Sequence, residues 1–114
     1  MRMFLAGDHP LLEELRRQYE TAQFASRELS GAGFFTRFSF PEPSTRLSVT
    51  HYFFMWDVSA EIPGIEQGVQ FALFVQDGWI QCLEGWAHVG EWPESTDGFT
   101  LFYDQSPRRV EFLR

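Results

Sequence analysis

The sequence predicts an α+β domain in which one N-terminal helix packs on a mainly antiparallel sheet of four to six strands. Apolar residues recur at helical spacing only near the start of the chain. Alternating apolar segments follow, and two of them flank Asp77-Gly78, the strongest short-range signal of a β-hairpin. Parallel strands would need crossover helices, and no helical pattern follows residue 30. The length of 114 residues fits a single domain, residues 1–114, with one core.

The helical pattern runs from residue 10 to residue 29, and we predict a helix over that range. Pro10 suits the first turn, where its missing N–H costs nothing. Gly31 is predicted to end the helix as a left-handed cap. Two i,i+4 pairs of opposite charge are expected on the outer side of the helix: Glu13 with Arg17, and Arg16 with Glu20.

The rest of the chain is predicted to consist of strands joined by turns and loops. The expected strands are 33–40, 48–60, the two arms of the hairpin, 99–103 and a short last strand at 110–113. Apolar residues on both faces of 48–60 indicate a central strand. Residues 62–68 and 90–98 are predicted to be loops.

Taking Asp77 and Gly78 as the two turn residues pairs Val75 with Ile80 and Phe71 with Glu84. This register places Glu84 on an apolar face, where a carboxylate needs a partner, a raised pKa or a position at the rim. Glu84 could therefore have either a structural role, as a rim residue or the partner of an Arg, or a functional one. A bulge after Gly78 would instead turn Glu84 outward.

Charge is distributed unevenly along the chain, whose net charge is −7. All nine basic residues are Arg, and residues 47–107 hold nine acids without a single Lys or Arg. Phosphate binding needs a basic face, so nucleic acid is not expected as a partner of this region. An acidic surface instead favours a basic protein partner, although charge that serves only solubility is the alternative.

No reaction motif stands out, since the chain has neither a Gly-rich phosphate loop nor a nucleophile elbow. His88 shares strand parity with Glu84, but four residues of strand span about 13 Å, too far for a catalytic pair. His51 lies on another predicted strand and could approach either of them. Cys82 is alone, which excludes an intrachain disulfide and a Cys-based metal cluster. We expect no cofactor and no metal, and we favour binding over catalysis.

The segment Glu91-Trp92-Pro93-Glu94 is a second candidate site. An exposed aromatic ring on a rigid acidic loop suits an anchor for a protein partner. Alternatively, Trp92 folds back and covers the open end of the sheet. Trp86 is expected in the core. The candidate partner- or ligand-binding residues are Glu84, Trp86, His88, Glu91, Trp92 and Glu94.

The start of the chain, MRMFLAGDHP, has too short an apolar run for a secretory signal, and no stretch approaches the length of a membrane span. We therefore expect a soluble, cytoplasmic protein without a membrane partner. Pairing of edge strands between two copies is a possible route to a homodimer.

Three segments carry a resemblance to a known family: Gly33-Phe34-Phe35, Pro63-Gly64-Ile65, and Leu83-Glu84-Gly85-Trp86 followed by Trp92-Pro93-Glu94. The chain resembles a family of small bacterial proteins whose members carry a Gly-Phe-Phe strand, a Pro-Gly-Leu-type loop, a long hairpin and a Leu-Glu-Gly-aromatic…Trp-Pro motif. The family tends to have Tyr at the position of Trp86. The resemblance covers most of the chain and implies no activity.

We therefore expect a non-enzymatic binding protein with an acidic surface around the hairpin and the 90–98 loop. An immunity-type inhibitor of a basic toxin is its most concrete version, by analogy with small acidic bacterial immunity proteins. The alternative is a small-molecule-binding module, or a small enzyme, whose sheet curves around an aromatic pocket with Glu84 at its base.

Overall fold

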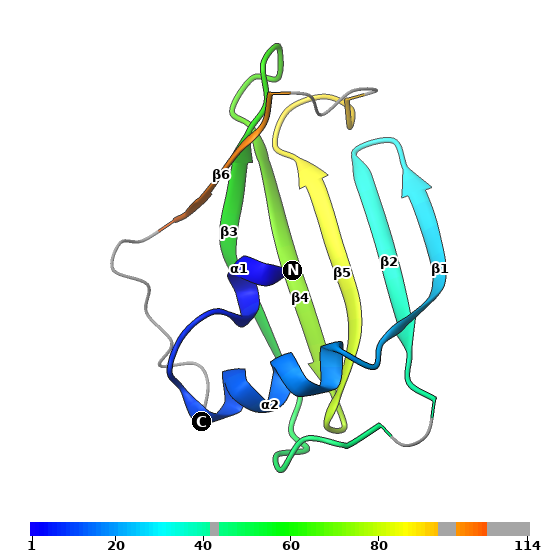
Figure 1. Cartoon of the computed structure of the whole chain (residues 1–114). Coiled ribbons are helices and arrows are strands. Elements are labelled where there is room, and N and C mark those ends of the chain that lie inside the picture. Colours follow the sequence, from blue (N-terminus) through cyan, green and yellow to red (C-terminus); the bar gives the residue numbers. More distant parts are fainter. Residues whose placement is uncertain (42–43, 94–97, 105–114) are drawn as a thin grey trace.

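The computed structural model describes residues 1–41, 44–93 and 98–104. Its described part contains an antiparallel sheet of six strands in the order β1-β2-β5-β4-β3-β6. Two helices lie against the sheet, so the expected α+β class is confirmed (Figure 1). The elements are α1 (Arg2–Leu5), α2 (Pro10–Tyr19), β1 (Gln23–Ser30), β2 (Gly33–Ser39), β3 (Phe53–Glu61), β4 (Val69–Gln76), β5 (Trp79–Ala87) and β6 (Thr100–Tyr103).

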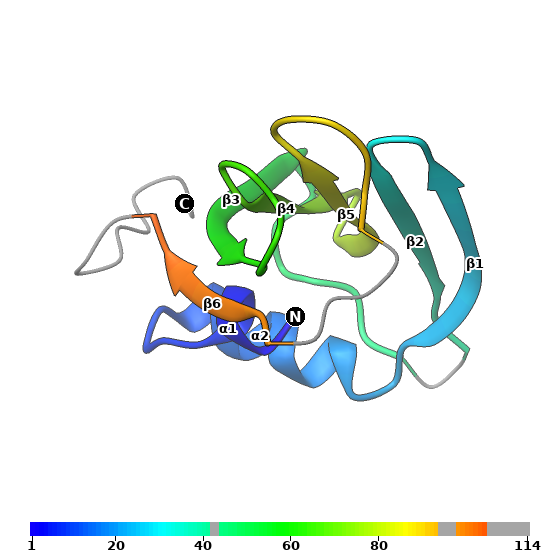
Figure 2. The same ribbon diagram turned by 90° about the horizontal axis from the view of Figure 1, so that it is seen from above.

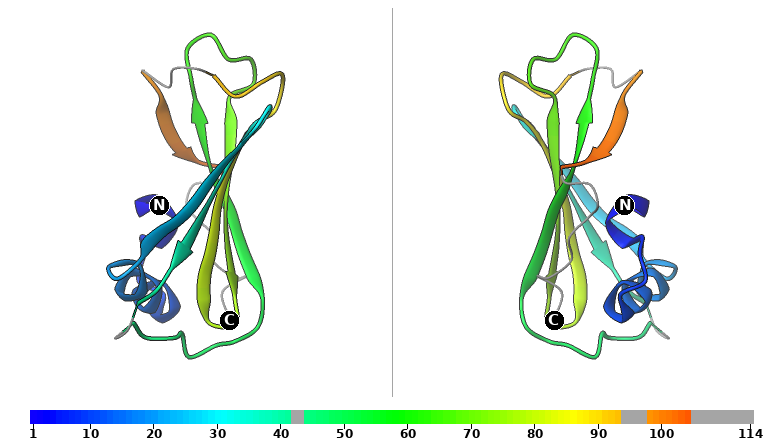
Figure 3. Two further views of the ribbon diagram at one scale, coloured as in Figure 1. Left: turned by 90° about the vertical axis from the view of Figure 1, so that its right-hand side faces the viewer. Right: turned by 90° about the vertical axis from the view of Figure 1, so that its left-hand side faces the viewer.

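Both helices lie on the same side of the twisted sheet, which we call the inner face (Figure 3). The opposite side is the outer face. The sheet bends so that its edge strands, β1 and β6, lean toward the side of the helices (Figure 2). The helices contact β3 and β5 and cover the half of the inner face nearest the β4–β5 turn.

The main core lies between the helices and the inner face. Its most deeply buried apolar side chains are Phe4, Leu12, Leu15, Met55, Leu73, Val75 and Ile80. Helix α2 begins as its sequence predicts, because the Nδ1 of His9 accepts the N–H of Leu11 and Pro10 occupies the first turn. Glu13 and Arg17 form the expected ion pair at 2.7 Å.

The predicted helix is wrong in its second half. Helix α2 ends at Tyr19, and Gln23–Ser30 forms the edge strand β1. The side chain of Leu29 is 79% exposed, although the helical pattern of apolar residues predicts that it is buried. Pairing along the length of β2 supplies backbone hydrogen bonds that outweigh local helical preference. Gly31 therefore lies in the β1–β2 turn rather than at a helix cap.

The second expected ion pair of the helix is replaced by a different contact. The guanidinium of Arg16 donates to the carbonyls of Leu5 and Gly7, at 2.5 and 3.0 Å. Arg16 thus joins the two helices by satisfying carbonyl groups at the end of α1.

Strand β3 is shorter at its start than the predicted 48–60, and it contains a bulge between Met55 and Val58. The bulge adds a residue and moves Val58 to the inner face. Strict alternation along 48–60 predicts Val58 on the same face as Phe54 and Trp56, and the bulge makes that prediction wrong. Strand β3 pairs with β4 on one side and β6 on the other, as expected for an internal strand.

The hairpin turn is the predicted one. Asp77 and Gly78 both adopt positive φ, and Val75 pairs with Ile80. A bulge follows on β5, because the next paired residue of β4, Phe74, lies opposite Cys82.

This bulge shifts every later pair of the hairpin by one residue. Ala72, rather than Phe71, lies opposite Glu84, and Gly85 lies opposite Phe71. The prediction that Glu84 shares the apolar face of Phe71 is therefore wrong, and Glu84 lies on the outer face.

Residues 62–68 form the expected loop between β3 and β4, and the strand predicted at 99–103 is β6. The strand predicted at 110–113 lies outside the described residues, as does Glu94. None of the helices in the described part of the chain has the length and apolar character required to cross a membrane.

Candidate functional site

The outer face carries a group of aromatic side chains that we call the outer aromatic row: Tyr52, Phe54, Trp56 and Phe74. Phe53 and Met55 point into the core, so their neighbours along β3 face outward. Phe54 lies 6.1 Å from Trp56, 5.8 Å from Phe74 and 6.2 Å from Tyr52, between ring centroids. Trp56 is 60% exposed. A contiguous exposed apolar group of this kind marks an interaction site more often than isolated exposed residues do.

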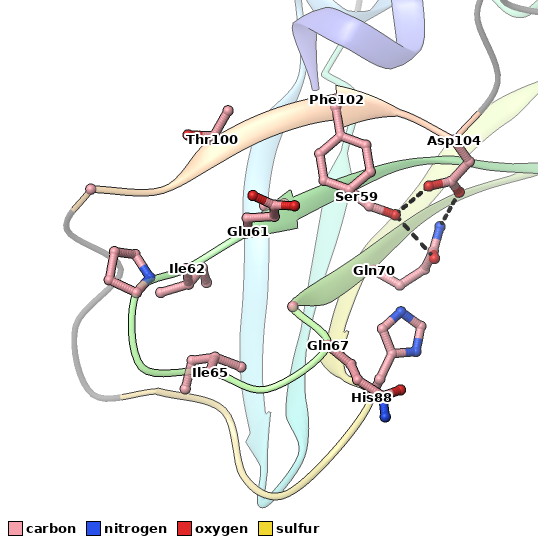
Figure 4. A pocket seen from close by; sticks show the side chains of 14 residues that line it. Ser59, Glu61, Ile62, Ile65, Gln67, Gln70, His88, Thr100, Phe102 and Asp104 are labelled. Atoms are coloured by element: carbon pink, nitrogen blue, oxygen red, sulfur yellow. Dashed lines mark hydrogen bonds between the residues drawn. The ribbon is translucent and has the colours of Figure 1, made fainter.

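A polar hollow of about 710 Å³ lies at the end of the sheet where β3, β4 and β6 meet. Its lining includes side chains of the outer face and of the β3–β4 loop (Figure 4). The lining residues that matter for the chemistry are Ser59, Glu61, Gln70, His88, Phe102 and Asp104. We call this feature the outer polar hollow.

A hydrogen-bond network connects three strands at the base of the outer polar hollow. Asp104, directly after β6, accepts from the hydroxyl of Ser59 at 2.6 Å and from the amide of Gln70 at 2.9 Å. The Gln70 amide also donates to the Trp56 carbonyl at 2.5 Å. That carbonyl lies in the bulge of β3, where pairing with β4 is interrupted. Gln70 therefore satisfies a backbone group that the bulge leaves without its strand partner.

The network does not form a catalytic triad. The Ser59 hydroxyl donates to a carboxylate, and no hydrogen bond joins it to His88 in the described part of the chain. His88 lines the same hollow from the end of β5, and its backbone N–H donates to Gly68. The Ser59 hydroxyl, the Gln70 amide and the Asp104 carboxylate thus form a polar hydrogen-bonding surface at the base of the hollow.

The outer polar hollow is acidic. Glu61 and Asp104 line it, and the residues of its lining that the structure describes include no Lys or Arg. Strands β3, β4, β5 and β6 contribute no basic residue anywhere, because residues 47–107 contain none. On the neighbouring part of the sheet, Arg37 of β2 lies opposite Cys82. A cationic group entering the hollow would therefore meet the carboxylates of Glu61 and Asp104, with no Arg or Lys among the described lining residues.

Glu84 and Trp86 lie on the outer face, half-buried, along β5. Glu84 is flanked by Phe35 of β2 and Ala72 of β4. Burial raises the pKa of its carboxyl above the usual value. Trp86 lies opposite Gln70 rather than in the main core where it was expected.

Trp92 lies on the inner face, away from the other candidates. Its ring is half-buried and contacts Phe34 and Phe71, with centroids 5.1 and 6.3 Å apart. Its backbone N–H donates to the Gly31 carbonyl at 2.9 Å. Trp92 thus folds back and covers the end of the sheet, as the second interpretation of this loop predicts, and it is not an exposed anchor. Glu91, next to it, is exposed.

The structure therefore brings Glu84, Trp86 and His88 to one side of the sheet and places Trp92 on the other. Sequence reasoning missed the network of Ser59, Gln70 and Asp104, because its members come from three separate strands. It also missed the exposure of the outer aromatic row, because aromatic residues that alternate along a strand are equally consistent with a buried face and an exposed one.

Residues 1–41, 44–93 and 98–104 contain no group of three or more His, Cys, Asp or Glu side chains arranged to hold a metal ion. Comparisons with protein-family models, with curated proteins and with solved structures found no match to this chain.

Proposed function

We propose that this chain is a binding protein that receives a cationic segment of a protein partner on its outer face. The observation that carries the proposal is the outer polar hollow, whose described lining contains Glu61 and Asp104 and neither Lys nor Arg. Carboxylates bind guanidinium groups through short charge-assisted hydrogen bonds. The size of the hollow, about 710 Å³, is sufficient for one or two side chains of a partner.

The outer aromatic row supports the same proposal. It continues along β3 from the outer polar hollow, so a bound segment would pass from carboxylates to aromatic rings. Arg and Lys side chains are attracted to aromatic faces by about 0.5–2 kcal/mol per contact. Trp and Tyr are also the residues that most often dominate the energy of protein interfaces.

An immunity-type inhibitor that neutralises a basic toxin is the most concrete form of this function. It is supported by the small size of the chain and by its net charge of −7. Opposite charge on the two proteins would accelerate their association, as it does for other inhibitors of basic enzymes.

The alternative of a ligand pocket with Glu84 at its base has less support. Glu84 does not line the outer polar hollow, and it does not line the apolar hollow that Phe34, Phe71 and Trp92 border on the inner face. Its half-buried position on the outer face makes it a neighbour of the proposed interface instead.

Binding of a hexa-arginine peptide, measured by isothermal titration calorimetry at low salt, tests the proposal. We expect the double variant Glu61→Gln, Asp104→Asn to bind the peptide about three- to tenfold more weakly than the wild type. Added salt should reduce the difference because it screens exposed charges.

The matched control is the double variant Glu13→Gln, Asp77→Asn, which removes the same charge away from the hollow. Asp77 has positive φ, which Asn tolerates. Equal weakening in both double variants would show that only net charge matters, and it would overturn the assignment to the outer polar hollow. Circular dichroism would establish that each variant is folded.

A further inference from the structure

The inner face holds a second hollow, on the half that the helices do not cover. Its volume is about 410 Å³, and its walls come from β1, β2, β3, β4, β6, the β3–β4 loop and the segments that flank residues 94–97. The two edge strands lean toward this side (Figure 2), and each contributes lining residues, Leu29 from β1 and Leu101 from β6. We call it the inner apolar pocket. It shares only Ala60 and Ile62 with the lining of the outer polar hollow, which lies on the opposite face.

The floor of the inner apolar pocket is aromatic. Phe34, Phe71 and Trp92 contact one another, with ring centroids between 5.1 and 6.4 Å apart. These rings lie close to β5 because Gly85 has no side chain, and a Cβ there would approach the Phe34 ring to 2.5 Å. The glycine therefore provides the space in which the aromatic floor is formed.

The rim of the pocket consists of apolar side chains that face water. Leu29, Phe99 and Leu101 line it, and all three are exposed. Each of these side chains keeps apolar surface in water that a ligand could cover. Three of them around one hollow give a ligand substantial apolar surface to cover.

Among the described residues that line the pocket, Arg27 is the one charged residue. Its Nε donates to the buried hydroxyl of Thr36 at 2.9 Å, and its guanidinium carbon lies 5.3 Å from the Phe34 ring centroid. These two contacts orient the guanidinium. In the described part of the chain the ion pair of Glu13 and Arg17 is the one salt bridge, so no described carboxylate neutralises Arg27.

We propose that the inner apolar pocket binds a small amphipathic carboxylate, such as a medium-chain fatty acid. Its apolar body would lie on the aromatic floor, and its carboxylate would accept hydrogen bonds from Arg27. Charge complementarity favours an anion, because the oriented guanidinium of Arg27 is the charged group that the described lining of the pocket presents. The volume lies within the range typical of small-molecule sites. This site goes beyond the binding of a basic partner and does not depend on it.

Calorimetric titration of the full-length protein with sodium dodecanoate, below its micelle concentration, tests the proposal. Dodecan-1-ol is the neutral reference. The wild type should bind dodecanoate about tenfold or more tightly than the alcohol, because a charged hydrogen bond adds to the same apolar contact. The variant Arg27→Met should lose this preference while still binding the alcohol.

Two further variants separate a specific site from general charge. Arg37→Met removes the same charge from the outer face of the neighbouring strand and should leave both affinities unchanged. Leu29→Asp, at an exposed position of an edge strand, should weaken dodecanoate binding about tenfold without unfolding the protein. Equal loss in Arg27→Met and Arg37→Met would overturn the proposal.

The competing occupants are a segment of this chain and a second copy of it. The variant Phe112→Ser, Leu113→Ser tests the first, because removal of a bound tail would raise dodecanoate affinity at least tenfold. Sedimentation equilibrium tests the second, because dodecanoate would then dissociate a dimer. Either result would overturn the proposal, whereas unchanged affinity and unchanged mass support it.

Discussion

The side chain of Gln18 accepts a hydrogen bond of 2.8 Å from the backbone N–H of Ile80, and thereby joins α2 to the β4–β5 hairpin. The same amide donates to the carbonyl of Gly78 at 2.8 Å. Gln18 is 2% exposed, so these bonds form away from water. The pairing of β2 with β5 ends at Cys82, and Ile80 lies beyond it. A helix side chain therefore satisfies a backbone group that the sheet does not reach.

The variant Gln18→Met should lower the free energy of unfolding by about 1–3 kcal/mol. Met has nearly the same size as Gln, but it cannot accept the N–H of Ile80, which would stay buried without a partner. The carbonyl of Gly78 keeps its bond from the Leu47 N–H. Urea unfolding followed by circular dichroism measures the difference. Gln76→Met, at an exposed position of β4, is the matched control and should stay within about 0.5 kcal/mol of the wild type.

The variant Gly33→Ala should destabilise the protein by more than about 3 kcal/mol, because it forces two paired strands apart. A Cβ at Gly33 would overlap the carbonyl oxygen of Gly85. Gly31→Ala, two residues earlier, is the control, since a Cβ there meets nothing within 4 Å. Thermal unfolding of the two variants measures the contrast. Similar melting temperatures would contradict the close contact between β2 and β5.

The variant Glu84→Gln should change the pH dependence of stability. Burial raises the pKa of Glu84 in the folded protein above its usual 4.5, so the folded state binds this proton more tightly than the unfolded state. The resulting stability is present below about pH 4.5 and is lost as pH rises through the raised pKa. Glu84→Gln, which mimics the protonated form, should therefore be neutral at pH 4 and stabilising by a few tenths of a kcal/mol at pH 7.

Urea unfolding of the wild type and of Glu84→Gln at pH 4, 5, 6 and 7 checks this expectation. Glu66→Gln, in the exposed loop between β3 and β4, is the control for loss of one negative charge. A constant difference between wild type and Glu84→Gln across the four pH values would contradict a shifted titration at this site.

Short-range signals in the sequence predicted much of the fold correctly. The Asp77-Gly78 turn, the start of α2 at Pro10 and the strand that opens at Gly33 each depend on neighbouring residues. Glycine at positive φ and proline in a first helical turn have the same physical meaning in any fold.

The errors arise where a distant segment decided the outcome. Helix α2 ends earlier than predicted because residues Gln23–Ser30 pair with β2. The bulges in β3 and β5 place Val58 and Glu84 on the faces opposite to those predicted. A single inserted residue reverses all later faces of a strand, and alternation of side chains does not reveal it.

In the candidate site, too, some features follow from the sequence and others depend on the tertiary structure. Its acidic character was visible in residues 47–107, since a long segment without Arg or Lys will present carboxylates whatever its fold. The network of Ser59, Gln70 and Asp104 was not visible, because these residues meet only when three strands pair. By itself, the sequence determined the local turns and the sign of the charge. Tertiary structure decided which face each side chain occupies, because strand register depends on hydrogen bonds between segments that are far apart in the chain.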